Sequence, residues 1–277
     1  MSAQILLEKI RSGGYDTAFA ALYGEAQVLA QRDRYAAAVE GFVDTFGGEG
    51  DLYLFSAPGR TEIGGNHTDH NYGRVLAGSV NLDVIAVVRP TQGGIRMQSE
   101  GYPIIEVDIT ELLPVEEEKN GSASLIRGTA ARFADLDYAI GGFDAYATSN
   151  VLKGSGLSSS AAFEILIAAI LDGLYNGFVI DFKTAAKISQ YAENVYFGKP
   201  SGLLDQMASS AGGLVTVDFR NDDPEVRAMN FDFAKYGYSL VVVATGGSHA
   251  DLTDEYAAVP GEIKAVAAHF GKEVLTQ

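Results

Sequence analysis

A run of small residues at positions 154–161, Gly-Ser-Gly-Leu-Ser-Ser-Ser-Ala, has the composition of a phosphate-binding loop. Glycine lets a backbone turn sharply and approach a ligand closely, and the apolar stretch that follows predicts a buried helix. The first amides of a helix have no partner within it, so phosphate oxygens could accept from them. A serine hydroxyl there could also help to hold Mg²⁺. A serine-capped helix after a flexible loop explains the same residues equally well.

Residues 58–73 form a second segment that could bind a ligand. Nine of its sixteen residues are Arg, Thr, Glu, Asn, His or Asp, and four others are glycine. Packing gives no reason for so many polar groups, whereas a hydroxyl-rich ligand needs several oriented donors and acceptors. An exposed loop is the alternative. His67, Asp69 and His70 could also be metal ligands, but no further His or Cys cluster supports them.

The third segment, residues 192–206, holds two acids among small and apolar residues, Glu193 and Asp205. Each could be an ordinary solvated helix residue, which is the usual position of a lone acid. In combination with a phosphate loop, they become candidates for a general base and a metal ligand.

The elements that must position these segments are a mixture of helices and strands without strict alternation, which predicts an α+β fold. Residues 1–50 have helical spacing, interrupted by Gly13 and Gly14. A long loop is expected over residues 57–73. Further helices are expected at 122–134, 158–174, 182–196 and 261–270. Strands are expected at 52–55, 83–89, 94–98, 104–108, 142–147, 213–217 and 239–244.

Composition narrows the classes of function. The 277 residues carry a net charge of −16, and a nucleic acid or an anionic membrane would need a basic face instead. The chain has no cysteine and four histidines, so thiolate zinc sites are excluded and a multi-histidine metal site is improbable. No apolar run reaches the ~18 residues of a membrane span, and the N-terminus does not read as a signal peptide. We expect a soluble, cytoplasmic protein with neither a nucleic-acid nor a membrane partner.

Together the three segments resemble the galactokinase branch of the GHMP kinase superfamily. Residues 58–73 fit its signature Gly-Arg-x-x-x-x-Gly-x-His-Thr-Asp-x-Asn, and residues 154–161 fit its Gly-x-Gly-Leu-Ser-Ser-Ser-Ala motif. Residues 192–206 are similar to a family segment that ends in Asp-Gln. The matching positions of the first motif are Gly59, Arg60, Gly65, His67, Thr68, Asp69 and Asn71. Three motifs in the same order across about 150 residues are far more specific than any one of them.

The resemblance implies an ATP-dependent phosphorylation of galactose at its anomeric hydroxyl, with Mg²⁺. It implies that Asp205 accepts or orients the proton of the attacking hydroxyl, and that Arg60 stabilises the phosphoryl group and keeps Asp205 ionised. Ser160 and Glu193 would hold Mg²⁺. The implied sugar-binding residues are Asn66, His67, Asp69, Gly202 and Tyr256. The implied phosphate-binding residues are Gly154, Ser155, Gly156, Leu157, Ser158, Ser159 and Ser160.

The resemblance also implies a two-lobed GHMP kinase fold with a ribosomal-protein-like first lobe. We expect a helical extension over residues 1–50, the first lobe over 51–187 and the beginning of a second over 188–277. A third glycine-rich motif of the family has no counterpart after Tyr256, and Asn66 stands where the family usually has Glu. A complementing C-terminal fragment is therefore an expected partner, besides galactose and ATP. Without it we expect exposed apolar faces at Val215, Val217, Leu240, Val242 and Val243.

Two other functions fit part of the pattern. One is another small-molecule kinase of the superfamily, acting on N-acetylgalactosamine or mevalonate; the dense polar loop favours a sugar over an apolar acid. The other is a regulator that binds sugar and ATP without turnover, which need not keep an intact serine loop or Asp205. A structural domain without a ligand would not need three ordered motifs.

Overall fold

The longest strand, β2 (Arg74–Thr91), organises the sheet of this computed structural model, which describes residues 1–151, 154–243 and 253–277. Strand β1 (Tyr53–Gly64) pairs antiparallel with β2 along most of its length. Strands β5 (Gly142–Ser149) and β6 (Leu214–Asp218) pair with the two halves of β2. The described strands follow the order β4-β3-β5-β2-β6-β7, with β1 paired to β2, where β3 is Ile95–Ser99, β4 is Ile104–Val107 and β7 is Glu225–Met229.

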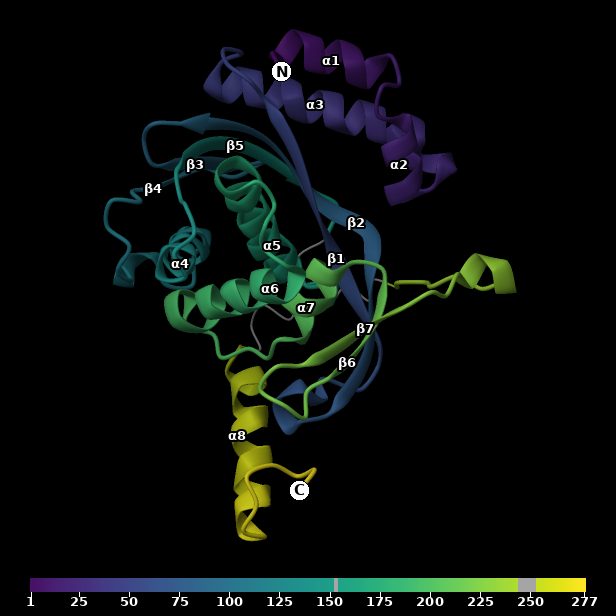
Figure 1. The fold of residues 1–277 in the computed structure, drawn as a ribbon, viewed down its shortest axis with the longest axis vertical. Helices are drawn as coiled ribbons and strands as arrows, with labels where there is room; N and C mark the ends of the chain where they lie inside the picture. The colour runs from purple at the N-terminus through teal and green to yellow at the C-terminus, as the bar shows by residue number, and fades with distance from the viewer. Residues whose placement is uncertain (152–153, 244–252) are drawn as a thin grey trace.

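The N-terminal helices cover one face of this sheet (Figure 1). They are α1 (Ala3–Arg11), α2 (Asp16–Tyr23) and α3 (Val28–Phe46), which confirms the helical prediction for residues 1–50. Their apolar faces pack on Ile85 and Val87 of β2 and on Leu52, which directly precedes β1. Because strand side chains alternate between faces, the residues between these positions point to the opposite layer.

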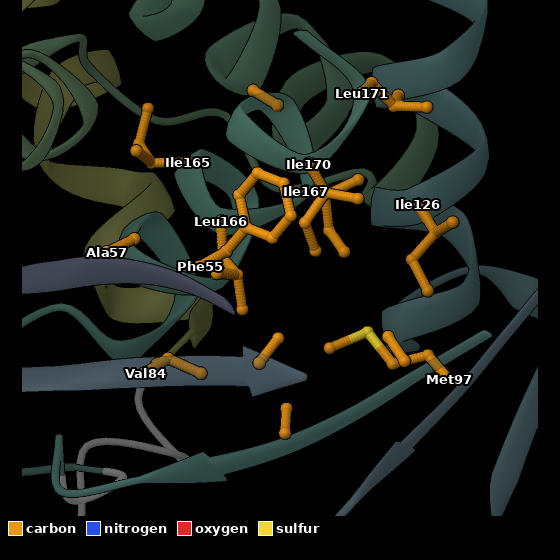
Figure 2. Packing of buried hydrophobic residues seen from close by; sticks show 14 of the residues in the cluster. Phe55, Ala57, Val84, Met97, Ile126, Ile165, Leu166, Ile167, Ile170 and Leu171 are labelled. Atoms are coloured by element: carbon orange, nitrogen blue, oxygen red, sulfur yellow. The ribbon is translucent and has the colours of Figure 1, made fainter. Parts of the chain in front are cut away.

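Helices α4 (Ser122–Asp135), α5 (Ser159–Leu171) and α6 (Phe182–Tyr191) cover the other face of the sheet. Figure 2 shows the core they share with Phe55, Ala57 and Val84, which are strand residues. Burial of each large side chain there contributes about 1.5–3 kcal/mol. Helix α5 is buried on most sides, as its almost wholly apolar sequence predicts, and it leads out of the glycine–serine loop. A seventh helix, α7 (Leu204–Ala211), packs on β6.

The structure corrects several of the expected elements. Residues 57–64 were expected in a loop, but β1 continues to Gly64 because its backbone still pairs with β2, as at Arg60 with Ser79. The expected strand at 239–244 is wrong over residues 239–243, and residue 244 lies outside the described residues. Strand β7 was not expected, because two of the five residues in its Glu-Val-Arg-Ala-Met sequence are charged. Backbone pairing with β6, rather than hydrophobicity, keeps it in the sheet.

The last helix, α8 (Thr253–His269), begins earlier than the expected residue 261 and contains Pro260. Its side chains are described from residue 258 on. The expectation of apolar exposure was wrong for Val215 and Val217, which are each 1 % exposed because Leu204, Met207 and Ala208 of α7 cover them. Leu240, Val242 and Val243 are exposed as expected.

Candidate functional site

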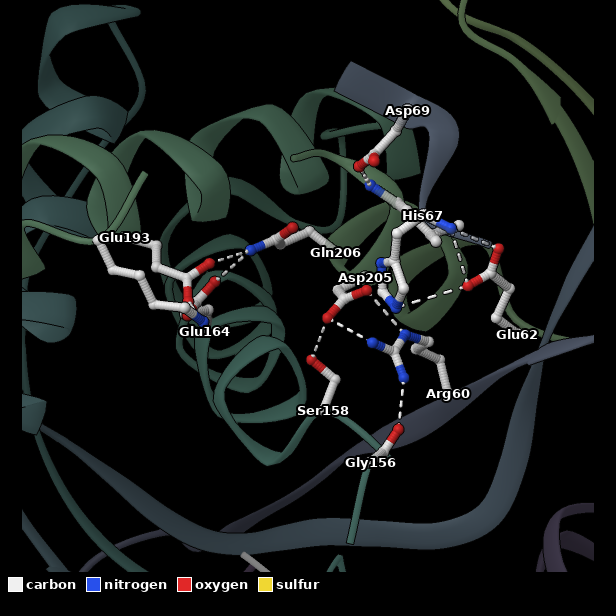
Figure 3. A network of polar contacts seen from close by, with 12 residues as sticks. Arg60, Glu62, His67, Asp69, Gly156, Ser158, Glu164, Glu193, Asp205 and Gln206 are labelled. Atoms are coloured by element: carbon white, nitrogen blue, oxygen red, sulfur yellow. Dashed lines mark hydrogen bonds and ion pairs between the residues drawn. The ribbon is translucent and has the colours of Figure 1, made fainter. Parts of the chain in front are cut away.

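Arg60 of β1 and Asp205 of α7 form an ion pair at the centre of the three motifs (Figure 3). Arg60 Nε lies 2.8 Å from Asp205 Oδ1, and Nη2 lies 2.5 Å from Oδ2. A two-point contact of this kind fixes both side chains in orientation as well as in distance. Arg60 is 6 % exposed, so the sheet and its surroundings hold it in place.

The surroundings of Asp205 favour its ionised form. Burial raises the pKa of the Asp205 carboxyl, but the charge of Arg60 and hydrogen bonds from Arg60 and Ser158 lower it more. The net pKa therefore lies below the ordinary value of 3.8. The side chain remains 28 % exposed and can be reached by a ligand. Of its roughly four lone-pair positions three are used, two by Arg60 and one by Ser158, which leaves one acceptor position on Oδ1.

The glycine–serine loop lies directly against β1. Arg60 donates its amide to the Leu157 carbonyl at 3.0 Å, and Arg60 Nη1 donates to the Gly156 carbonyl at 2.6 Å. A Cβ atom at Gly59 would lie 2.9 Å from the Leu157 carbonyl oxygen, so only glycine allows this close approach. The loop and the arginine therefore form one unit, although almost a hundred residues separate them.

Ser158 does not cap the helix that it precedes. It has a φ of 56° in the left-handed region and makes no side-chain cap hydrogen bond to α5. Its hydroxyl donates instead to Asp205 Oδ2 at 2.7 Å. The alternative of a serine-capped helix therefore does not describe Ser158, and the first amides of α5 receive no hydrogen bond from its side chain. A phosphate oxygen could accept from such amides.

The polar loop after β1 meets the third motif through Asp69. The Leu204 amide donates to Asp69 Oδ2 at 3.1 Å. At Gly202 a Cβ atom would lie only 1.8 Å from the same oxygen, so this contact requires glycine. Asp69 Oδ1 faces His70 Nδ1 at 3.4 Å. The structure thus brings Asp69 and Gly202 together. Asp69 Oδ2 is already used to hold residues 202–204 in place.

Asn66 and His67 begin the turn of that loop, with φ angles of 51° and 53°. Asn and His adopt this left-handed conformation more readily than most residues, which gives Asn66 a conformational reason to be there. Glu62 Oε1 accepts from the His67 amide at 2.9 Å and so holds the turn. The His67 side chain is more than half exposed and lies near Asp205, where it can meet a ligand (Figure 3).

Glu193 lies in a second polar cluster with Glu164, Gln206 and Lys199 (Figure 3 shows the first three). Gln206 Nε2 donates to Glu193 Oε2 at 2.8 Å and to Glu164 Oε2 at 3.0 Å. Lys199 Nζ donates to Glu193 Oε1 at 3.0 Å. Burial and the nearby Glu193 charge raise the pKa of Glu164. Because Gln206 follows Asp205 in α7, this cluster and the Arg60–Asp205 pair share one helix.

The oxygen ligands of this region suit Mg²⁺, a hard cation that prefers oxygen. Ser160 and Glu164 lie four residues apart on α5 and therefore share a helix face, and Gln206 joins Glu164 to Glu193. Within the described residues no group of three His, Cys, Asp or Glu side chains could hold a metal. Ser160 and Glu193 would therefore need phosphate oxygens to complete the coordination, and Lys199 would have to leave Glu193 Oε1.

Sequence analysis overlooked several residues of these clusters. Glu164 had a recognisable signal, because it is the one acid in an otherwise apolar helix before Asp172. Glu62 and Lys199 act through contacts with nearby His67 and Glu193, and Gln206 joins Glu164 to Glu193; residue spacing alone does not reveal such contacts. The expected sugar contact Tyr256 falls where side chains lie outside the described residues, so its position stays a prediction. The remaining roles assigned from the motifs also stay predictions.

The fold and the order of the three motifs are those of the GHMP kinase superfamily. Residues 124–213 match the family described as GHMP kinases N terminal domain, and residues 40–90 match the Galactokinase galactose-binding signature. Within the GHMP kinases, the chain belongs to the galactokinase family. The two-lobed α+β prediction of fold is confirmed at the level of the shared fold, and the boundaries of the lobes stay a prediction.

Two curated relatives show how much of the family the chain covers. The galactokinase of Streptomyces coelicolor is 32 % identical over 242 residues, which are 85 % of this chain and 61 % of the relative. The galactokinase of Clostridium tetani is 32 % identical over 167 residues, which are 60 % of this chain and 42 % of the relative. The chain thus spans about half the length of the curated relatives it matches.

Comparison with solved structures also matches the chain to part of a galactokinase. The structure of Lactococcus lactis galactokinase complexed with galactose superposes with a TM-score of 0.65 at 26 % identity, and the match covers 73 % of this chain and 53 % of that one. The Methanococcus jannaschii mevalonate kinase has a TM-score of 0.58 at 15 % identity, over 80 % of this chain and 74 % of that one, which shows the fold alone. Across the described residues, no helix has the length and apolarity needed to span a membrane.

Proposed function

We propose that this chain contributes the catalytic site of a kinase that transfers the terminal phosphoryl group of ATP to the anomeric hydroxyl of galactose. The observation that carries the proposal is the position of Asp205. Ser158 joins it to the phosphate loop, Arg60 holds it ionised, and its helix α7 begins at Leu204, whose amide donates to Asp69 of the polar loop. A carboxylate between a phosphate site and a polyol site is where a general base for phosphoryl transfer is needed.

The proposed reaction forms a bond between the sugar oxygen and the γ-phosphorus and breaks the bond to the bridging oxygen of ADP. Asp205 accepts or orients the hydroxyl proton through its remaining acceptor position on Oδ1. Arg60 offsets charge on the transferring group while remaining paired with Asp205. Residues 154–160 bind the phosphates with backbone amides and serine hydroxyls. Mg²⁺, held by Ser160 and Glu193, would neutralise phosphate charge when bound.

We assign the sugar to the side of Asp205 that carries His67, Asp69, Gly202 and Asn66, with Tyr256 as a further contact. The galactose-binding signature over residues 40–90 and the galactose-bound L. lactis relative support galactose over other sugars. A cytoplasmic location, where ATP is available, forms part of the same proposal. Because the chain spans half of its relatives, we also propose that a complementing C-terminal segment acts with it.

The test is a coupled ADP-release assay over a panel of galactose, N-acetylgalactosamine, glucose and mevalonate, together with calorimetric binding of galactose and ATP. Assays run with the chain alone and with the C-terminal half of a related galactokinase added in trans. We expect the highest kcat/KM for galactose. Faster turnover of N-acetylgalactosamine or mevalonate would overturn the substrate. Binding of both ligands without ADP release under either condition would indicate a regulator that binds without turnover.

A further inference from the structure

Asp83 is a buried carboxylate between the N-terminal helices and the sheet, outside the three motifs. It is 2 % exposed. Three elements donate to it: Tyr23 of α2 through its hydroxyl, Arg34 of α3 through Nη1 at 2.6 Å, and Ser56 of β1 through Oγ at 2.5 Å. Arg34 Nη2 also donates to the Asp83 carbonyl at 3.0 Å. We refer to Tyr23, Arg34, Ser56 and Asp83 as the Asp83 cluster.

The cluster is a specific polar contact inside an otherwise apolar interface. The surrounding contacts between the helices and the sheet are made by side chains such as Phe42, Ile85 and Val87. Burial raises the pKa of Tyr23, whose hydroxyl also pairs with that of Tyr35 at 2.7 Å, so Tyr23 remains a donor. Apolar packing alone would usually be as stable as a buried ion pair. The cluster therefore contributes positioning more than stability, because it fixes where α2 and α3 lie relative to the middle of β2.

At this middle part of β2 the pairing with β1 is irregular and the pairing with β5 ends. Asp83 pairs with Pro58 of β1, and the register is broken between Pro58 and Arg60. Such irregularities redirect the following side chain, which here is the arginine of the Arg60–Asp205 pair. On the other side, the Asp83 carbonyl accepts from the Asn150 amide at 2.9 Å, directly after β5 and four residues before the glycine–serine loop. One residue thus contacts both segments that carry the proposed phosphate site.

We propose that Asp83, with Tyr23 and Arg34, is a positioning element through which the N-terminal helices hold Arg60 and the glycine–serine loop in register. The contact it maintains is the hydrogen bond from the Arg60 amide to the Leu157 carbonyl, at 3.0 Å. Its effect on turnover rests on the proposed function, whereas its effect on this hydrogen bond does not. The N-terminal helices are then part of the working site rather than only a cover for the sheet.

The experiment measures amide hydrogen exchange, residue by residue, in the full chain and in three variants. Tyr23→Phe removes one donor and keeps the ring, and Asp83→Asn keeps the shape and removes the charge. Val39→Ala is the matched control, because Val39 is fully buried in the same helical layer and outside the cluster. We expect exchange of the Arg60 amide to rise about tenfold in the first two variants, as expected for losing one buried hydrogen bond to a charged group. Val39→Ala should raise exchange in α1–α3 and leave the Arg60 amide unchanged.

The same proteins are assayed for ATP turnover, with the C-terminal half of a related galactokinase present. We expect Tyr23→Phe to raise KM for ATP more than it lowers kcat, and Val39→Ala to change neither when measured below its melting temperature. Unchanged exchange of the Arg60 amide in Tyr23→Phe, or an equal rise in Val39→Ala, would overturn the inference. If no protein turns over ATP while the exchange pattern holds, the proposed function fails and the positioning role stands.

Discussion

Asp205 and Arg60 are bonded through two nitrogens and two oxygens, so shape and charge can be tested separately at this pair. Asp205→Asn is nearly isosteric, and Arg60 and Ser158 can still donate to its amide oxygen. The amide cannot take a proton from the attacking hydroxyl. We expect galactose binding to stay within a few-fold of the parent while kcat falls by roughly 10²-fold or more. Calorimetry and the ADP-release assay on one preparation measure both; parental kcat would make Asp205 a structural residue.

The pH dependence of the pair follows from the lowered pKa of Asp205. The base is ionised above that pKa, so the parent should lose Asp205-dependent turnover only below about pH 3.8. Arg60→Gln removes the charge that lowers the pKa and leaves the burial that raises it, so the acid limb of kcat/KM should move to higher pH. Stability gives an independent measurement. In the parent, the ionised carboxyl stabilises the fold above pH 3.8 and loses this effect on acidification; in Arg60→Gln, stability should instead fall as the pH rises above 3.8. An acid limb or a Tm profile that does not move would contradict this.

Glu193 is held by Lys199 on one oxygen and by Gln206 on the other, which makes its proposed metal role testable. Glu193→Gln should raise the Mg²⁺ concentration for half-maximal rate by at least about tenfold, since even residues that only orient metal ligands have effects of this size. Lys199→Met is the matched variant, because freeing Oε1 from its competitor should lower that concentration. Measuring the rate as a function of Mg²⁺ concentration in the parent and both variants tests this prediction. Identical curves for Glu193→Gln and the parent would show that Glu193 is an ordinary buried acid without a metal role.

Helix α5 is preceded by a residue whose conformation is costly, and at the scale of elements this is the clearest sign of function. Ser158 has a φ of 56°, a region that non-glycine residues occupy at a cost of about 1–3 kcal/mol. Ser158→Gly should remove that strain and also the hydrogen bond to Asp205, so we expect an unchanged or higher Tm with lower kcat. Ser158→Ala loses the hydrogen bond and keeps the strain, so its Tm should fall below that of Ser158→Gly. Calorimetric melting with kinetics compares the two; equal Tm values would mean that the backbone there is not strained.

The elements could be predicted from sequence where local pattern decides them. Helix α5 is nearly all apolar, so it was predicted close to its observed bounds, and the helical spacing of residues 1–50 predicted helices there without their individual bounds. Strand β1 continues through Gly59 because a partner strand satisfies its backbone, and glycine-rich sequence gives no sign of that partner. Residues 239–243 show the reverse, since a run of Leu and Val predicts a strand but none forms.

For the candidate site too, local sequence pattern predicted some features, and contacts between separate segments determine the others. Motif chemistry alone was enough to single out Asp205, Glu193 and residues 154–160. The hydroxyl of Ser158 turned toward Asp205 and the bridge through Gln206 depend on contacts between segments that are tens of residues apart. The spacing of residues in one sequence does not reveal such contacts. Gly202 lies within a motif, but the reason that glycine is required there is clear only from the structure, in which Asp69 lies beside it.

At the scale of the whole molecule, the segment after β7 differs from the rest. Figure 1 shows it projecting away from the sheet, and it exposes a series of large apolar side chains. They are Tyr236, Tyr238, Leu240, Val241, Val242 and Val243. Contiguous apolar exposure of this kind marks interaction surfaces on soluble proteins. The relatives extend well beyond the matched region, so a further segment of the family is available to cover this surface.

We therefore predict that residues 1–277 alone associate through residues 236–243, and that a complementing C-terminal segment suppresses this association and completes the active kinase. The replacement Val241→Glu with Val243→Glu places charge on two side chains that are 75 % and 74 % exposed. It should keep the lone chain monodisperse and weaken binding of the complementing segment, because charge at the core of an apolar interface is costly to bury. Val179→Glu is the control, since Val179 is 68 % exposed outside this surface. Light scattering of the lone chains, followed by ATP turnover on titration with the segment, measures both effects. A monodisperse and fully active parent chain of 29.4 kDa, indifferent to the segment, would show that the exposed surface needs no cover.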